Sequence, residues 1–586
     1  MELDESVPNV SLSTKDAQEA VDSQAAKMDE ETKCLGCGFF ANSLTGDSVD
    51  WLQCNGCQNW LHFACANITT KEIQLIDKFY CEGCKPTFGP STFVRKSARA
   101  RTNVDYSSLN EGHFSTVEEN HEHRYIKAFK NGNIKYVLPE TFPRMAPEDI
   151  TLEYLERLPA MTEPIVVPRA LNPRPFQEQN VFYHSEDGSE LKIPESEEAD
   201  DFAQELVNDH AQDKLGMVIP EGLTVRRVAE LHGPSAPLNV IDVKSQEGDK
   251  GKKWTLGRWA DYYESPGDKP IRNVISLEVS YSPMGKLLQR PDVVRKLDLQ
   301  DAVWPATDLT RKAVKYYVLM SVADCYTDFH IDFGGSSVFY HVLKGKKVFF
   351  FVPPTKQNLK KYEDWCISPA QNETFFPDQT KECYRVDLEA GDTMLIPSGW
   401  IHSVWTPEDS LVVGGNFLTK LHLDMQLRIN ELEKTTGVTP QYRYPSFQKV
   451  QWYTMLKYLE LDPIPDTVEK DLLSGNQFPR DTPIWQEFDA FGKNSTPNPE
   501  LFNHKYYAKS EIEGWPELLK FIFRTVLISL DRLEGIPQKS KQAVTRSIPK
   551  GYGEPLDLAR RFACWVAWKR GNENLPEWAY PDAVLP

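Results

Sequence analysis

Short apolar runs separated by turn-forming residues recur between residues 238 and 417. Runs of this length match single strands and are too short for helices of ordinary length. Several short strands at such a spacing are typical of a β-barrel or a double-stranded β-helix. The expected strands are residues 238–243, 273–279, 316–322, 337–343, 348–352, 393–396 and 410–417.

After residue 426 the pattern changes, and apolar residues recur at intervals of three and four positions. This spacing predicts amphipathic helices, which proline-rich links separate. Their aromatic side chains are expected to form a core that docks on the strands. Strands followed by helices predict a multidomain chain of the α+β class. The expected helices are residues 427–436, 447–461, 516–533 and 556–568.

Cysteines cluster near the start of the chain, where seven of the eleven lie between Cys34 and Cys84. They fall in pairs with two residues between the partners, and His62 pairs with Cys65 in the same way. A structural zinc ion takes four nitrogen or sulfur ligands, and a two-residue loop lets both partners reach one ion. Eight ligands therefore predict two zinc sites. The ligands are Cys34, Cys37, Cys54, Cys57, His62, Cys65, Cys81 and Cys84.

The order of these ligands, four cysteines, a histidine and three cysteines, resembles that of the plant homeodomain (PHD) finger. The resemblance implies that alternate pairs share an ion. One zinc would take Cys34, Cys37, His62 and Cys65, and the other would take Cys54, Cys57, Cys81 and Cys84.

Two tryptophans of this segment, Trp51 and Trp60, match positions that form an aromatic cage in PHD fingers that bind methylated lysine 4 of histone H3. Such a cage attracts a methylammonium group through cation–π interactions. The alternative interpretation is that Trp60 only packs against the small zinc-bound core.

A candidate metal site lies within the strand-rich region. His330 and Asp332 are two residues apart, so in an extended chain both side chains point to the same face. His402, in the segment Pro-Ser-Gly-Trp-Ile-His, supplies a second imidazole. Two histidines and one carboxylate that leave coordination positions open form the ligand set of non-haem Fe(II) oxygenases. The alternative is that these residues are hydrogen-bonded members of the surface or core.

The segment Cys-Tyr-Thr-Asp-Phe-His-Ile-Asp-Phe-Gly-Gly-Ser-Ser-Val-Phe-Tyr-His, residues 325–341, resembles the JmjC domain of histone lysine demethylases. Ile-Pro-Ser-Gly-Trp-Ile-His and Gly-Gly-Asn-Phe-Leu belong to the same resemblance, which covers residues 238–444. It implies a double-stranded β-helix of the cupin type that binds Fe(II) and 2-oxoglutarate. It also implies oxidative removal of methyl groups from histone H3, with release of formaldehyde and succinate.

Within these enzymes the chain is most similar to the fungal histone demethylation protein 1 type, which implies mono- or dimethylated lysine 36 of histone H3 as the substrate. Lysine 9 or 27 of histone H3 is the nearest alternative. A chromatin-binding scaffold without catalysis is an alternative of another class, and a protein hydroxylase is a third.

The resemblance also implies the residues that bind 2-oxoglutarate. Lys347 would pair with the distal carboxylate, Thr327 would donate a hydroxyl hydrogen bond, and Tyr340 and Asn273 would line the pocket. Hydrogen bonds to a charged acceptor are stronger than neutral ones. The alternatives are that Lys347 is a solvated lysine of a hairpin turn and that Tyr340 is a core aromatic. His341 points the opposite way and is expected to be structural.

The chain has 586 residues, 66 basic and 85 acidic, with a net charge of −19. This length accommodates two to four domains. The acidic balance argues against broad binding of phosphate and suits a basic histone tail or nucleosome partner. Without a run of 18 apolar residues and with a polar N-terminus, the sequence predicts no transmembrane helix, membrane contact or secretory signal. The predicted location is the nucleus.

These features predict five segments. Residues 1–30 form a disordered acidic tail, residues 31–86 the PHD-type zinc finger, and residues 87–237 a linker and helper region with an acidic insert. Residues 238–425 form the JmjC catalytic domain and residues 426–586 the helical C-terminal domain. The basic run at residues 95–101 predicts at most a weak contact with DNA, and the sequence does not indicate an oligomeric state.

Overall fold

The computed structural model describes residues 33–38, 51–93, 122–173, 213–476 and 507–584, except for residues 67, 69–75, 133, 158–160, 221, 250–252, 268 and 573. The chain divides into two compact units, Met1–Thr102 and Asn103–Pro586. The predicted acidic tail, the basic run and most of the acidic insert lie outside the described residues.

The first unit is a small module built on two antiparallel hairpins, with Leu52, Leu61 and Phe79 in its core beside buried cysteines. A core of this size does not stabilise a fold without metals or disulfides. Its elements are β1 (Trp51–Gln53), β2 (Trp60–His62), β3 (Ile76–Lys78), α3 (Lys85–Phe88) and β4 (Thr92–Phe93).

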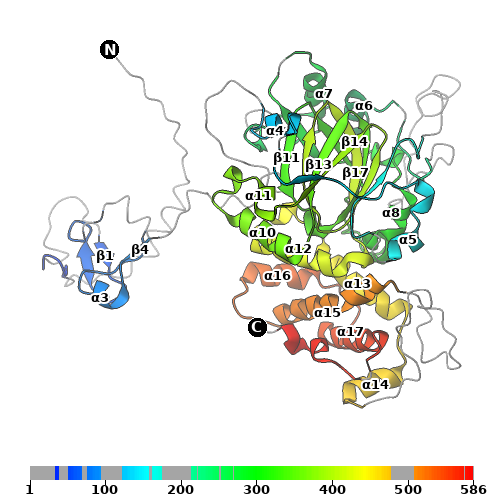
Figure 1. Cartoon of the computed structure of the whole chain (residues 1–586). Helices are drawn as coiled ribbons and strands as arrows, with labels where there is room; N and C mark the ends of the chain where they lie inside the picture. Colours follow the sequence, from blue (N-terminus) through cyan, green and yellow to red (C-terminus); the bar gives the residue numbers. More distant parts are fainter. Residues whose placement is uncertain are drawn as a thin grey trace, which may run out of the picture. The chain divides into compact units, whose positions relative to one another are not determined.

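The second unit contains an eight-stranded and a five-stranded sheet, in which the strands from residue 317 onward are antiparallel and have the orders β15-β12-β17-β10 and β11-β16-β13-β14. They lie above the C-terminal helices in Figure 1 and confirm the predicted double-stranded β-helix. The strands are β10 (Tyr317–Ser321), β11 (Cys325–His330), β12 (Ser337–Lys344), β13 (Lys346–Val352), β14 (Cys383–Glu389), β15 (Thr393–Ile396), β16 (Ile401–Thr406) and β17 (Ser410–Phe417).

Strands from earlier in the chain extend both sheets. β6 pairs with β15, β9 pairs with β10, and β5 lies parallel to β14. β5 (Val137–Pro139) and β6 (Ile165–Val167) come from the region predicted as a linker and helper, and each forms an edge of one sheet. The other added strands, which come from the start of the segment predicted as the catalytic domain, are β7 (Ile241–Asp242), β8 (Glu247–Gly248) and β9 (Arg272–Glu278).

The bounds of β15 and β17 are as predicted, and those of β9, β10, β12 and β13 differ by one or two residues. The predicted strand at 238–243 is wrong except for Ile241–Asp242. Among the eight strands from β10 to β17, three were not predicted, namely β11, β14 and β16. Polar residues interrupt them, as Thr327 and Asp328 do in β11, so they contain no long apolar run.

Shorter helices surround the sheets. Several begin with a threonine whose side chain accepts a hydrogen bond from the third residue of the helix, as Thr224 does from Arg227. They are α4 (Ile126–Lys130), α5 (Leu152–Glu156), α6 (Val225–His232), α7 (Leu256–Glu264), α8 (Asp292–Leu297), α9 (Leu299–Val303), α10 (Lys356–Ile367) and α11 (Phe376–Thr380). The 3-10 turns are η2 (Pro147–Asp149), η4 (Gly285–Leu287), η5 (Phe333–Gly335), η6 (Gln371–Glu373), η7 (Lys420–His422), η8 (Pro440–Tyr442), η11 (Glu577–Ala579) and η12 (Pro581–Val584).

The C-terminal helices pack around a second core in which Trp452, Trp515 and Trp565 are fully buried. Helices α15 and α17 lie side by side in this layer (Figure 1). The predicted helical domain is present, although α14 and α16 were not predicted. The helices are α12 (Leu423–Thr435), α13 (Phe447–Leu461), α14 (Asp466–Ser474), α15 (Lys509–Ser529), α16 (Gln538–Ser547) and α17 (Pro555–Lys569).

The predicted start of α15 at Pro516 is wrong, because the helix begins at Lys509 and Pro516 lies inside it. Proline lacks an N–H and leaves the carbonyl four residues earlier, that of Ile512, without its helical partner. Arg570 Nη1 donates to this carbonyl at 2.6 Å. A side chain that is distant in sequence thus compensates for the proline.

Among the described residues, no helix combines the length and the apolar character that crossing a membrane requires.

Candidate metal and co-substrate site

The three predicted metal ligands meet at one end of the β11–β16 pair. His330 ends β11 and lies opposite His402 of β16, with 4.3 Å between the ring centroids. Asp332 follows β11, and its Oδ2 lies 3.8 Å from His402 Nε2. The candidate ligand atoms of the three residues all lie within 4.8 Å of one another. The structure therefore brings together the set that the sequence proposed.

A β-bulge in β11 determines which side chains face this site. Thr327 lies opposite Val404 and His330 opposite His402, so three residues on β11 match two on β16. The extra residue re-aims the strand. As a result Thr327 and His330, which are three apart and would otherwise face opposite ways, line the same cavity.

Both imidazoles are oriented by backbone carbonyls. His330 Nδ1 lies 2.8 Å from the carbonyl oxygen of Asp328, and His402 Nδ1 lies 3.0 Å from that of Trp400. A carbonyl only accepts, so each Nδ1 carries the proton and each Nε2 keeps its lone pair for a metal. Burial lowers the pKa of both rings to about 4, so both are neutral at pH 7. Two neutral imidazoles and one carboxylate fit a divalent iron.

The ligands open into a cavity of about 660 Å³. Thr327, Lys347, Tyr340 and Asn273, the residues predicted for 2-oxoglutarate, all line it. Part of its wall comes from the segment that leads into α13, which the sequence analysis did not connect with the site. The residues of this segment that line the cavity are Pro440, Tyr442, Arg443, Tyr444, Pro445 and Ser446.

Lys347 lies inside the barrel and is only 3% exposed. Its Nζ donates to Ser321 Oγ and to Thr406 Oγ1, both at 2.8 Å. No carboxylate among the described residues pairs with it, and burial lowers the pKa of its ammonium to about 8. The alternative of a solvated lysine in a turn is therefore wrong. A buried cation held only by hydroxyls suits an anionic ligand, because an unpaired buried charge is costly.

The remaining predicted residues form a chain of hydrogen bonds beside Lys347. Ser321 Oγ donates to Asn273 Oδ1 at 2.7 Å, and Asn273 Nδ2 lies 3.3 Å from Thr327 Oγ1. Asn273, which lines the cavity, thus connects the buried hydroxyl of Ser321 with that of Thr327, which also lines it. The hydroxyl of Tyr340 makes no hydrogen bond with a described residue, which leaves it available to a ligand. Ser321 and Thr406 were missed, since isolated hydroxyl residues on strands carry no distinct signal.

His341 faces away from the cavity, as predicted, and its Nδ1 lies 2.8 Å from Thr393 Oγ1 on the neighbouring strand. This contact supports a structural role.

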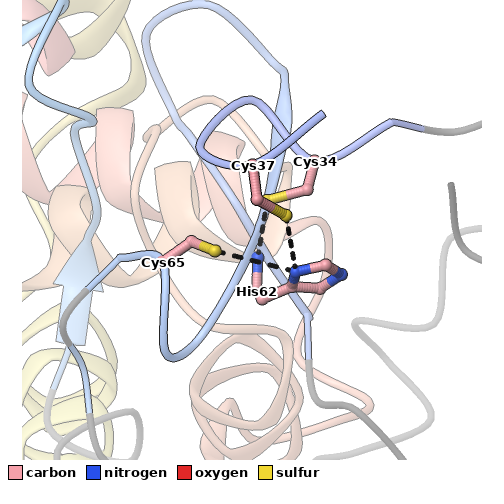
Figure 2. Close-up of side chains that lie close together, drawn as sticks. All are labelled: Cys34, Cys37, His62 and Cys65. Carbon is pink, nitrogen blue, oxygen red and sulfur yellow. Dashed lines mark hydrogen bonds between the residues drawn. The ribbon is translucent and has the colours of Figure 1, made fainter. Parts of the chain in front are cut away.

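In the first unit the eight predicted zinc ligands form two groups, each with four candidate ligand atoms within 4.8 Å of one another. Figure 2 shows the first group, in which His62 Nδ1 lies 3.4 Å from Cys37 Sγ and 3.7 Å from Cys65 Sγ. The groups are Cys34, Cys37, His62 and Cys65, and Cys54, Cys57, Cys81 and Cys84.

Backbone N–H groups lower the pKa of two of the thiols, Cys34 and Cys54, which favours the thiolate that a metal binds. Burial raises the pKa of Cys54, but backbone N–H groups that include those of Cys57 and Cys81 outweigh burial and lower it to about 6. In two of the four tight loops a glycine is required for steric reasons. A Cβ on Gly36 would lie 2.7 Å from Cys65 Cβ, and one on Gly56 would lie 2.9 Å from Cys84 Sγ.

The two tryptophans considered for a methyl-lysine cage lie on one face of the β1–β2 hairpin. Trp51 is opposite His62 and Gln53 is opposite Trp60, so all four side chains point to the same side. Both indoles are half-buried. The Trp51 ring lies 4.0 Å from the His62 ring and packs against the small core, which leaves Trp60 as the freer of the two.

Three families match the chain in agreement with this organisation. The family described as "PHD-finger" matches residues 34–84, "JmjC domain, hydroxylase" matches residues 317–417, and "Jumonji helical domain" matches residues 421–475.

Curated relatives extend the similarity beyond these domains. "JmjC domain-containing histone demethylation protein 1" of Aspergillus fumigatus is 51% identical over 94% of this chain and 40% of its own length. Its namesake in Yarrowia lipolytica is 37% identical over 88% of this chain and 93% of its own length. "Lysine-specific demethylase 2A" of Xenopus tropicalis is 43% identical over 42% of this chain and 22% of its own length.

The fold, the ligand sets and these matches define a JmjC protein that carries a PHD finger. The chain spans about two fifths of the length of the Aspergillus relative. It belongs to the JmjC domain-containing histone demethylation protein 1 family.

Proposed function

We propose that this protein is an Fe(II)- and 2-oxoglutarate-dependent histone lysine demethylase. The observation that carries the proposal is the position of the buried Lys347 ammonium, which has no carboxylate partner among the described residues and lines the same cavity as His330, Asp332 and His402. A three-ligand metal site alone suits many reactions. A metal site with a buried lysine ammonium group in the same cavity suits an oxo-acid co-substrate, because the ammonium can pair with the carboxylate of that acid.

The residues divide into two sets. His330, Asp332 and His402 hold iron, and Lys347 and Thr327 hold the distal carboxylate of 2-oxoglutarate, with Tyr340 and Asn273 beside them. Bound iron and 2-oxoglutarate would activate O2, the oxidant, so that one oxygen atom converts 2-oxoglutarate to succinate and CO2 and the other removes a methyl group as formaldehyde. The chain supplies orientation, two neutral imidazoles and a buried ammonium group.

The proposed substrate is mono- or dimethylated lysine 36 of histone H3, and the alternative is lysine 9 or 27. Glu278 lines the same cavity as the metal ligands, and burial raises the pKa of its carboxyl. A carboxylate there suits a cationic methyl-lysine. The choice of lysine 36 depends on similarity to the histone demethylation protein 1 type, because the ligand set does not distinguish methyl-lysines.

The finger is proposed to bind two zinc ions and to recognise the histone H3 tail, with Trp60 and Trp51 as the cage for methylated lysine 4. The protein would then act on nucleosomes in the nucleus, with at most a weak DNA contact from residues 95–101. Replacing the indole in Trp60→Ala should weaken binding of a lysine-4-trimethylated peptide and leave the zinc content unchanged. Unchanged peptide affinity would remove the cage assignment.

Mass spectrometry of histone H3 peptides tests the enzymatic proposal. Peptides methylated at lysine 4, 9, 27 or 36 are incubated with the protein, Fe(II), ascorbate and 2-oxoglutarate. Loss of one CH2 per reaction at lysine 36 is the expected result. Loss at lysine 9 or 27 instead contradicts the substrate, and gain of an oxygen indicates a hydroxylase. Absence of turnover in a protein that binds the metal indicates a scaffold.

A further inference from the structure

The turn that follows the metal ligand Asp332 is held by the C-terminal helical layer. This turn, η5, has Gly334 at its centre with φ of 63°. The Gly334 N–H donates to Glu433 Oε1 at 2.6 Å. Glu433 lies on α12, 99 residues later in the chain, and is only 1% exposed. A buried carboxylate accepts this bond, so it is stronger than a bond between neutral groups.

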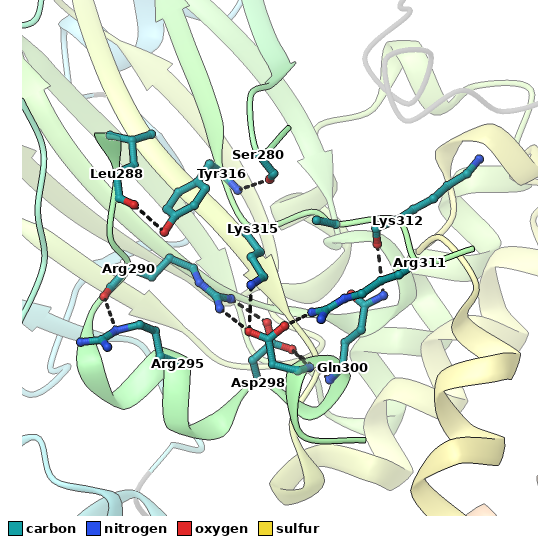
Figure 3. Close-up of polar contacts among 12 residues, drawn as sticks. Ser280, Leu288, Arg290, Arg295, Asp298, Gln300, Arg311, Lys312, Lys315 and Tyr316 are labelled. Carbon is teal, nitrogen blue, oxygen red and sulfur yellow. Dashed lines mark hydrogen bonds and ion pairs between the residues drawn. The ribbon is translucent and has the colours of Figure 1, made fainter. Parts of the chain in front are cut away.

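Side chains of the helical layer pack closely against the turn. A Cβ on Gly334 would lie 2.7 Å from Tyr444 Cβ, and one on Gly335 would lie 3.0 Å from Ile429 Cβ. Helix α12 and the segment before α13 therefore enclose the turn from two sides. Tyr444 is itself held, because its hydroxyl donates to Gln300 Oε1 at 3.2 Å. Figure 3 shows Gln300 within the polar cluster that also holds Lys312 of the cavity wall.

By contrast, the Asp332 side chain is held weakly by direct contacts. Among the described residues outside the metal site, its carboxylate accepts one hydrogen bond, from Asn416 Nδ2 at 3.4 Å. That distance lies beyond the usual range for such bonds. The direction of the carboxylate therefore depends on the backbone of the turn, which bonds back to Asp332 through Gly335 N–H at 3.0 Å.

We propose that Glu433 is a positioning residue for the metal site: through Gly334 it fixes the turn that aims Asp332 at His330 and His402. The helical layer thereby contributes to metal affinity without touching the metal. This inference rests on the proposed function only in assigning a metal to the three ligands. Residues that orient ligands from outside a metal site typically change metal affinity by about 10- to 100-fold when removed.

The test is titration of the full chain with Mn(II), followed by the electron paramagnetic resonance signal of the free ion. Glu433→Ala should raise the Kd for Mn(II) by about 10-fold or more. Glu433→Gln keeps an acceptor without the charge, so its Kd should lie between those of Glu433→Ala and the unaltered protein. Glu431→Ala is the matched control, since this carboxylate lies on the same helix but is exposed and pairs with Lys434.

A Kd for Glu433→Ala equal to that of the unaltered protein overturns the proposal, even if the variant melts at a lower temperature. A Kd for Glu433→Gln as high as that for Glu433→Ala overturns the role of the hydrogen bond. If Glu433→Ala does not fold, Glu433→Gln alone decides: a raised Kd supports the proposal and an unchanged one overturns it. An unaltered protein that binds Mn(II) but demethylates no peptide rejects the proposed function and leaves this inference intact.

Discussion

Among single residues, Lys347 is the one on which the proposed co-substrate most depends. Its neighbour Lys346 is half-exposed and pairs with Glu389, while Lys347 enters the barrel and contacts only hydroxyls among the described residues. Two adjacent lysines thus have opposite environments because successive residues of a strand face opposite sides. This pair offers a matched comparison of a buried and a half-exposed ammonium.

Lys347→Met keeps most of the side-chain volume and removes the charge, so it should weaken 2-oxoglutarate binding without weakening Mn(II) binding. A hydrogen bond to a charged group contributes about 1.5 to 3 kcal/mol, which corresponds to roughly a 10- to 150-fold rise in Kd. Calorimetric titration of the Mn(II)-loaded protein measures this change. Lys346→Met should bind 2-oxoglutarate normally, and an equal loss in both variants would contradict the assignment.

The same residue predicts a pH dependence. Burial lowers the pKa of Lys347 to about 8, so the ligand-free protein loses this charge as the pH rises through that value. A carboxylate favours the protonated lysine, so 2-oxoglutarate affinity should be constant below about pH 8. Above it the Kd should rise, by at most about tenfold per pH unit. Calorimetry between pH 7 and 10 measures the profile, and a flat profile in that range would show that Lys347 is not the anion partner.

Among the structural elements, a buried charged cluster connects α9 with the cavity wall. Asp301 contacts Arg290, Arg311 and Lys315, and Asp298 pairs with Arg290 at 2.6 Å. Figure 3 shows these cations converging beside Asp298. Residues 312–314, next to this cluster, line the cavity. The cluster thereby attaches a wall of the site to the core of the second unit.

Asp301→Asn should destabilise the second unit, because Arg290, Arg311 and Lys315 would each lose the charge of a carboxylate that they contact. Removing one partner of a buried ion pair costs about 3 to 5 kcal/mol, and partial exposure of Asp301 favours the lower end of that range. Urea unfolding measures the change. Asp292→Asn is the control, since Asp292 is half-exposed beside Lys296 and should change stability by less than about 1 kcal/mol. Equal effects of the two variants would contradict a special role for the cluster.

For the whole molecule, the two units differ in what stabilises them. The first has a core of a few residues around the cysteine groups, and the second has large apolar cores in the barrel and in the helical layer. Only the second buries enough apolar surface to fold without a metal.

Removal of zinc with a chelator should therefore unfold residues 34–84 and leave the second unit folded. Structural zinc contributes about 10 to 16 kcal/mol to small zinc-binding modules, more than a core of this size supplies. Hydrogen–deuterium exchange measures the effect separately in each unit. Persistent protection of residues 51–62 in the chelated protein would contradict a structural role for zinc.

The sequence alone predicted the parts that depend on local spacing. It predicted the cysteine pairs with two intervening residues, the His-x-Asp pair at His330 and the apolar runs of β15, β17 and α13. These features could be recognised because the residues that form each of them are neighbours in the chain. The same reasoning failed where polar residues interrupt a strand, as in β11, and where a proline lies inside a helix, as in α15.

Tertiary structure alone decided how these parts meet. The bulge that turns Thr327 toward His330, the hydroxyls of Ser321 and Thr406 around Lys347, and the bond from Gly334 to Glu433 all join residues on different elements. Such contacts depend on strand register and on the packing of helices against the barrel, and neither is encoded in the spacing of residues along one segment.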